Sequence, residues 1–136
     1  MAVIPLDSYY NDQSHLPLEV RKRTNFDHPD AFEWTLLAHQ IAELRQGRPI
    51  DQPTYSYITC TRLEETVRVN PCEVIIIEGI MVLYDKSLRD LMDLKIFVDA
   101  GADERFLRVL ERDIAERGHP LEMLIDKYRN VLKPMH

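Results

Sequence analysis

The sequence predicts an α/β protein, built from a parallel β-sheet flanked by helices and a small β-hairpin flap. Two apolar runs rich in β-branched residues, within 74–77 and 93–99, are typical of parallel strands buried on both faces. Segments with helical periodicity accompany these runs, and strands that alternate with helices indicate an α/β sheet. The segment 52–71 alternates and is rich in Tyr, Thr and Val, which favours two short antiparallel strands around a turn.

The composition fits one globular domain that covers residues 1–136. A hydrophobic content of 45% is sufficient for a single core at this length. The net charge of −6 argues against general binding to nucleic acids. No apolar run approaches the roughly 20 residues that span a bilayer, and we expect neither a signal peptide nor a membrane partner. Cys60 and Cys72 lack the spacing of a zinc site, so we expect reduced thiols and a cytoplasmic protein.

The N-terminal part is expected to hold one strand and one helix. The run 2–7 is typical of a short buried strand that ends on an acid, and a long polar connection follows it. A helix is expected from Asp30, which resembles an N-cap because Glu33 three residues later completes a capping-box pattern. Gly47 is expected to end this helix. Its buried face repeats with helical spacing at Trp34, Leu37, Ala38, Ile41 and Leu44.

The C-terminal part continues the alternation of strands and helices. The hairpin leads into the expected strand at 74–77, and the expected strand at 93–99 comes next. Helices are expected at about 103–117 and at about 121–132. No internal repeat or low-complexity tract interrupts this order.

Three of the expected strands end on an acid, namely Asp7, Glu78 and Asp99. In open α/β sheets ligands bind beyond the carboxyl ends of the strands, where such acids can hold a metal or act as a base. Each acid could equally cap the turn that follows it, and for Asp99 we favour that interpretation. Glu78 differs, because an apolar run followed by an acid and a glycine is the Walker B arrangement, whose carboxylate faces the Mg²⁺ of a bound nucleotide.

The expected helix at 103–117 carries arginines along one stripe, at Arg105, Arg108 and Arg112, with Arg117 at its end. These residues could form a solvated face with i, i+4 ion pairs. They could also grip phosphate groups, because an arginine fork matches phosphate oxygens bidentately. The pattern alone favours the solvated face.

Aromatic side chains gather in the flap and in the long connection. They could stack on a planar ligand or pack the flap onto the domain, and the two interpretations are about equally favoured. The residues are Tyr9, Tyr10, Phe26, Tyr55 and Tyr57.

Several motifs, in their order along the whole chain, resemble the uridine kinase family. They are LDSYY, NFDHPDAF, PTYSYITCTRLEETVRV, VIIIEGI, RDLMDLKIFVDAGADER and RDIAERG. The resemblance implies a P-loop kinase-type sheet, a nucleoside-binding hairpin at about 52–71 and a lid at about 105–120. It implies transfer of the γ-phosphoryl group of ATP or GTP, with Mg²⁺, to the 5′-hydroxyl of uridine or cytidine in pyrimidine salvage. It also implies a homo-oligomer for the full-length form.

The resemblance further implies a role for individual residues. Asp7 corresponds to the general base that faces the 5′-hydroxyl, and Asp27 to the carboxylate that binds the ribose hydroxyls. Glu78 corresponds to the acid associated with Mg²⁺, and Arg112 and Arg117 to lid arginines that reach the phosphates. The remaining positions of the implied nucleoside pocket are Tyr10, Phe26, Tyr55, Tyr57 and Cys60.

The chain departs from the family pattern in one large feature. A phosphate-binding GxxxxGK[ST] should precede LDSYY, and residues 1–136 contain none. We therefore expect a fragment that is inactive alone, without the central first strand between 74–78 and 93–99 and without the last strand. A non-catalytic nucleoside-binding or regulatory paralogue is the alternative, supported by substitutions within the motifs. Cys60 stands where the family usually has a His, and Val109, His119 and Lys127 replace Arg, Arg and Gln.

Overall fold

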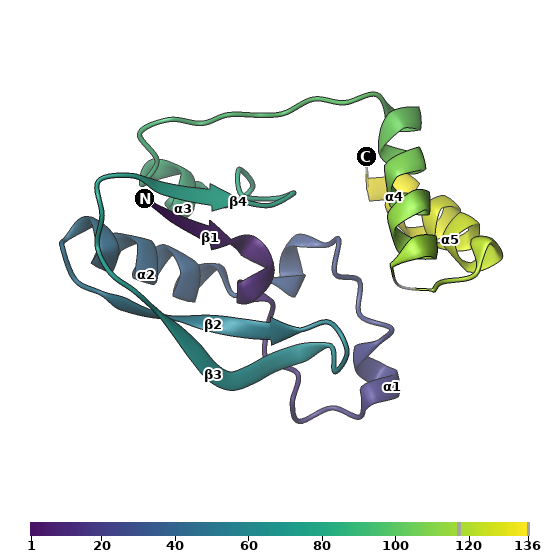
Figure 1. The fold of residues 1–136 in the computed structure, drawn as a ribbon, viewed down its shortest axis with the longest axis horizontal. Coiled ribbons are helices and arrows are strands. Elements are labelled where there is room, and N and C mark those ends of the chain that lie inside the picture. The colour runs from purple at the N-terminus through teal and green to yellow at the C-terminus, as the bar shows by residue number, and fades with distance from the viewer. Residues whose placement is uncertain (117, 136) are drawn as a thin grey trace. The chain divides into compact units, whose positions relative to one another are not determined.

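The computed structural model describes residues 1–116 and 118–135, and the chain divides into two compact units, Met1–Lys95 and Ile96–His136. Among the described residues, the strands belong to the first unit, and the second contains helices (Figure 1). The expected mixed α/β architecture with a parallel sheet is confirmed.

The parallel sheet consists of β1 (Ala2–Pro5) and β4 (Ile75–Glu78). The two strands run side by side in Figure 1, with Pro5 opposite Glu78 at their carboxyl ends. The connection between them carries helix α2 and the hairpin. β1 is shorter than the expected strand at 2–7, because Leu6–Tyr9 wind into the 3-10 turn η1.

The expectation of two strands buried on both faces is wrong in this chain. Val74 and Ile76 are 51% and 42% exposed. Residues 93–99 form no strand, since a strand requires a hydrogen-bonded neighbour and none pairs with them in the described parts of the chain. Their apolar side chains are 69–84% exposed, at Leu94, Ile96, Phe97 and Val98.

Helix α2 (Trp34–Arg45) begins later than expected. Asp30 is not its N-cap, because Pro29–Ala31 close a separate 3-10 turn, η2, which His28 caps by accepting the Asp30 N–H at 3.2 Å. The end is as expected: Gly47 has a φ of +78° and donates its N–H to the Leu44 carbonyl. The core joins this helix to β1, η1 and the hairpin through Ile4, Leu6, Tyr9, Leu37, Ile41, Leu44 and Ile50.

The predicted hairpin is confirmed as β2 (Ile50–Ser56) paired antiparallel with β3 (Thr61–Val69). Its register places Tyr55 opposite Arg62. Two short helices complete the unit: α1 (Leu18–Arg21) in the long connection and α3 (Lys86–Asp90) after β4. Asp85 caps α3 by accepting the Leu88 N–H at 2.8 Å.

The second unit contains α4 (Ala102–Ala115) and α5 (Leu121–Lys127), which confirms the two expected helices. α5 continues into the π-helical turn η3 (Tyr128–Leu132) and the 3-10 turn η4 (Lys133–Met135). The rings of Phe106 and Tyr128 pack with centroids 4.3 Å apart. Among the described residues, no helix has the length and apolarity needed to cross a membrane.

Candidate functional site

Asp7 lies in η1, directly beyond the carboxyl end of β1. Glu78 ends the neighbouring strand and is exposed. The chain after β4 passes close to η1, and Gly79 permits this approach with a φ of +148°. A Cβ atom at Gly79 would lie 2.5 Å from the Leu6 Cβ. Only glycine therefore fits the backbone beside the turn that carries Asp7.

An aromatic cluster borders η1, with Tyr10 at its centre. Tyr10 is 7% exposed and stacks on Phe32, with ring centroids 4.5 Å apart. Phe26, from the long connection, meets its edge at 5.0 Å. Tyr55, from β2, lies 5.0 Å from the same ring, and burial raises the pKa of its hydroxyl. The cluster therefore joins the connection to the hairpin, so these aromatics do pack the flap onto the domain.

Asp7 accepts a hydrogen bond from a tyrosine hydroxyl. Tyr57 donates its hydroxyl to Asp7 Oδ2 at 2.8 Å. The pKa of Tyr10 is raised, first by burial and then by the charge of Asp7 and a hydrogen bond to it. The predicted base thus contacts Tyr57, which packs through Tyr55 against Tyr10.

Asp27 belongs to the long connection, next to Phe26 of the aromatic cluster. Its backbone N–H donates to Asn25 Oδ1 at 3.1 Å, which fixes the local turn beside Phe26. Its negative charge contributes to raising the pKa of Tyr10, and it follows Phe26, whose ring meets that of Tyr10.

Cys60 belongs to the loop of the hairpin. It has a φ of +50°, and its thiol donates to the Tyr57 carbonyl at 3.5 Å. The structure therefore brings together seven of the predicted site residues, namely Asp7, Tyr10, Phe26, Asp27, Tyr55, Tyr57 and Cys60.

The predicted phosphate-binding arginines belong to the second unit. Arg112 donates its Nε–H to Asp113 Oδ1 at 2.8 Å. Arg108 pairs with Glu104 at 2.7 Å, which matches the solvated-face interpretation at that position. Arg117 lies outside the described residues.

A metal site made of protein side chains alone is not found. No group of three or more His, Cys, Asp or Glu side chains within 1–116 and 118–135 could hold an ion. The single exposed carboxylate of Glu78 fits a different arrangement, because Mg²⁺ is commonly bound by one or two carboxylates together with substrate phosphates and waters.

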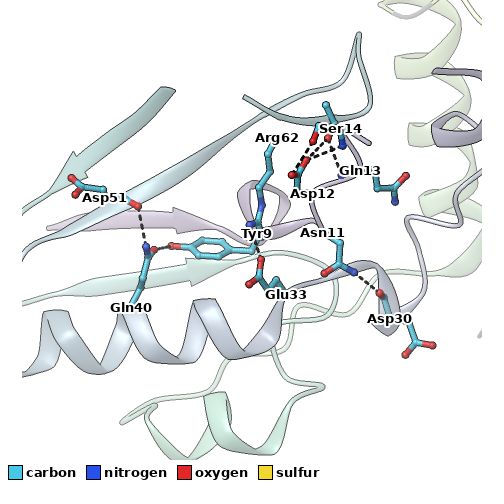
Figure 2. A network of polar contacts seen from close by, with 11 residues as sticks. Tyr9, Asn11, Asp12, Gln13, Ser14, Asp30, Glu33, Gln40, Asp51 and Arg62 are labelled. Carbon is cyan, nitrogen blue, oxygen red and sulfur yellow. Dashed lines mark hydrogen bonds and ion pairs between the residues drawn. The ribbon is translucent and has the colours of Figure 1, made fainter. Parts of the chain in front are cut away.

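A polar network around Tyr9, Asp12 and Arg62 was not expected from the sequence (Figure 2). Tyr9 donates its hydroxyl to Gln40 Oε1 at 2.6 Å, and Gln40 donates to the Asp51 carbonyl at 2.9 Å. Thr61 donates to Asp12 Oδ1 at 3.1 Å, which ties the long connection to β3.

Arg62 is a largely buried charged member of this network. Its side chain is 14% exposed and pairs with Glu33 at 2.6 Å, just before α2. The buried Nε and Nη2 atoms have no hydrogen-bond partner among the described residues. Cross-strand pairing with Tyr55 places both side chains on one face of the hairpin. That register is the signal that could have revealed Arg62 as inward-facing.

Comparison with known proteins identifies the family. The model of the phosphoribulokinase / uridine kinase family matches residues 2–136. The chain belongs to this family. Uridine kinases from Streptococcus pneumoniae, including strains Hungary19A-6 and CGSP14, are 53% identical over all 136 residues. The chain spans 64% of the length of these relatives.

Solved structures share the fold at low sequence identity. The crystal structure of a proposed fructose transport system kinase from Silicibacter sp. TM1040 has a TM-score of 0.75 at 20% identity. The match covers 94% of this chain and 64% of that one. A proposed uridine kinase from Bacillus stearothermophilus has a TM-score of 0.54 at 19% identity, over 86% of this chain and 66% of that one. Both support the kinase-type α/β fold.

Proposed function

We propose that this chain is the nucleoside-binding part of a kinase that phosphorylates uridine or cytidine on the 5′-hydroxyl, in pyrimidine salvage. The gathering of Asp7 with the aromatic cluster at the end of β1 is the observation that carries the proposal. The family and the 53% identical uridine kinases support the same class of substrate.

The proposed nucleoside pocket combines carboxylates with aromatic faces. The carboxylate of Asp27 can accept hydrogen bonds from both ribose hydroxyls at once. The rings of Phe26, Tyr55 and Tyr57 offer faces on which a pyrimidine can stack. Tyr10 supports these rings, and Cys60 adds a small polarizable group from the hairpin loop.

In the proposed reaction Asp7 orients the 5′-hydroxyl and accepts its proton as the oxygen attacks the γ-phosphoryl group of ATP or GTP. Glu78 would help to hold Mg²⁺ on the nucleotide, and Arg112 and Arg117 would contact the phosphates. Bound Mg²⁺ offsets the charge that spreads over the phosphoryl oxygens. Catalysis of this kind consists mainly of positioning.

We propose that residues 1–136 bind the nucleoside but do not transfer phosphate alone. They contain no GxxxxGK[ST], so the backbone cradle, the Lys and the Ser or Thr for a nucleotide are not supplied by this segment. The alternative, a non-catalytic nucleoside-binding paralogue, is favoured by the substitutions at Cys60, Val109 and His119. A cytoplasmic location and a homo-oligomeric full-length form stay predictions.

A reconstitution experiment separates the two functions. Residues 1–136 are assayed for ATP-dependent formation of uridine monophosphate, alone and with a GxxxxGK[ST] strand–loop–helix segment fused before Met1. The kinase proposal expects product only from the fused chain. A fused chain that binds both uridine and ATP without turnover would favour the paralogue, and turnover by residues 1–136 alone would overturn the expected inactivity.

A further inference from the structure

We propose that Tyr57 is a positioning residue for Asp7, and that its hydroxyl holds the carboxylate in the orientation that receives the nucleoside 5′-hydroxyl. The inference rests on the proposed role of Asp7 as the base. It adds a function to Tyr57 that a ring contact with the pyrimidine does not require, because a phenylalanine would supply the same aromatic face.

The contact joins two distant segments. Tyr57 follows β2 in the loop of the hairpin, and Asp7 lies in η1, 50 residues away in the sequence. The distance of 2.8 Å is that of a well-formed hydrogen bond from a hydroxyl to a carboxylate. The hairpin loop thus contacts the proposed base directly.

The Tyr57 ring is supported although it is 61% exposed. It packs against Tyr55 with centroids 5.4 Å apart and an interplanar angle of 78°, and Tyr55 packs against Tyr10. The loop is closed by further hydrogen bonds: Thr59 donates its N–H to Ser56 Oγ at 3.2 Å, and the Cys60 thiol donates to the Tyr57 carbonyl. These contacts hold the hydroxyl at Asp7 and reduce the cost of ordering it when substrate binds.

The carboxylate retains capacity for a substrate. An ionised carboxylate has about four acceptor sites. The hydroxyl of Tyr57 uses one of them, which leaves room for a 5′-hydroxyl. In the opposite arrangement, Tyr57 only blocks Asp7 until it moves away. Removing the hydroxyl would then strengthen the binding of uridine instead of weakening it.

The test is Tyr57→Phe, which keeps the ring and removes the hydroxyl. Binding of uridine and of 5′-deoxyuridine to residues 1–136 is measured by calorimetry. The affinity for uridine divided by the affinity for 5′-deoxyuridine reports the contact of the 5′-hydroxyl. We expect the variant to lower this ratio by about 3- to 10-fold, the range of a single hydrogen bond, with the affinity for 5′-deoxyuridine unchanged. Tyr84→Phe is the matched control, because Tyr84 is 60% exposed and contacts the Trp34 ring instead.

A double variant shows whether Tyr57 acts through Asp7. Asp7→Asn should lower the ratio, and adding Tyr57→Phe should then have little further effect, because residues that act as one unit are not additive. If Tyr57→Phe binds uridine with an unchanged or increased ratio, the positioning role is overturned and the proposed function stands. Additive effects in the double variant would have the same meaning. Failure of wild type to bind either nucleoside would overturn the proposed function, and this inference with it.

Discussion

Asp7 and Asp27 are carboxylates of the same cluster, but their surroundings differ. Asp7 follows a strand end and accepts the Tyr57 hydroxyl, whereas Asp27 lies in the long connection, in a turn fixed by Asn25. Two carboxylates from different segments beside one aromatic cluster suit a ligand with hydroxyls at two separate positions. The two residues should therefore have separable effects on turnover and on binding.

The first prediction concerns turnover. In a chain with a phosphate-binding segment fused before Met1, Asp7→Asn should reduce kcat at least about 100-fold, far more than it weakens uridine binding, because general-base catalysis contributes about 10²- to 10⁴-fold. Steady-state assays of uridine monophosphate formation measure both constants. The account of Asp7 fails if kcat is retained, or if only KM rises.

At the residue scale, the sequence predicted which side chains gather, but not which hydrogen bonds and ion pairs hold them in place. LDSYY, NFDHPDAF and the hairpin identified Asp7, Asp27 and Tyr55 through the family resemblance. The Tyr57–Asp7 hydrogen bond and the Arg62–Glu33 ion pair depend on how the hairpin packs on η1 and α2. No local pattern encodes that packing.

At the element scale, the junction of β1, β4 and η1 depends on one glycine. Gly79→Ala should lower the free energy of unfolding by about 1–3 kcal/mol or more, since it combines an unfavourable φ of +148° with a Cβ placed 2.5 Å from that of Leu6. Chemical denaturation measures the change. Gly47→Ala is the control: its φ is +78° but no atom lies within 4 Å of the added Cβ, so its cost should be smaller. Equal costs would show that the contact with Leu6 is not limiting.

The ion pair between the hairpin and α2 gives a third prediction. Glu33→Gln should destabilise the chain by about 1–3 kcal/mol, because it leaves a largely buried arginine without its counter-charge. Adding Arg62→Met should recover part of this loss, since both charged groups are then removed. Thermal and denaturant unfolding of the single and double variants test the coupling. A double variant as unstable as the sum of the two single variants would argue against it.

Element boundaries show where local patterns misled. The helical spacing of Leu37, Ile41 and Leu44 correctly predicted the buried face of α2. The capping-box pattern at Asp30 was wrong, because Pro29–Ala31 turn separately and Phe32 then extends to bridge with Tyr10. Tertiary contacts of the aromatic cluster thus override the local start signal.

At the scale of the whole molecule, the sequence predicted the α/β class and the hairpin, but not the state of 93–99. A segment rich in β-branched residues is suited to a strand, but it forms one only where a neighbouring strand is present to pair with it. The exposed residues Leu94, Ile96, Phe97 and Val98 form an apolar stretch that only Lys95 interrupts.

This stretch gives a prediction on association. Residues 1–136 should self-associate, since exposed apolar segments with free backbone groups promote pairing between chains. Phe97→Lys should shift the sedimentation profile toward monomer. Ile58→Lys, at an apolar side chain that is 86% exposed but lies outside this stretch, should not. A wild-type chain that is monomeric at all concentrations would contradict this account.

The central claim is that Asp7, Asp27 and the aromatic cluster form a nucleoside site. Calorimetric titration of residues 1–136 with uridine and with 2′,3′-dideoxyuridine tests it most directly. We predict tighter binding of uridine, and loss of most of the difference in Asp27→Ala, which corresponds to about 1.5–3 kcal/mol for a charge-assisted hydrogen bond. Equal binding of the two nucleosides by wild type, or an undiminished difference in Asp27→Ala, would contradict the account.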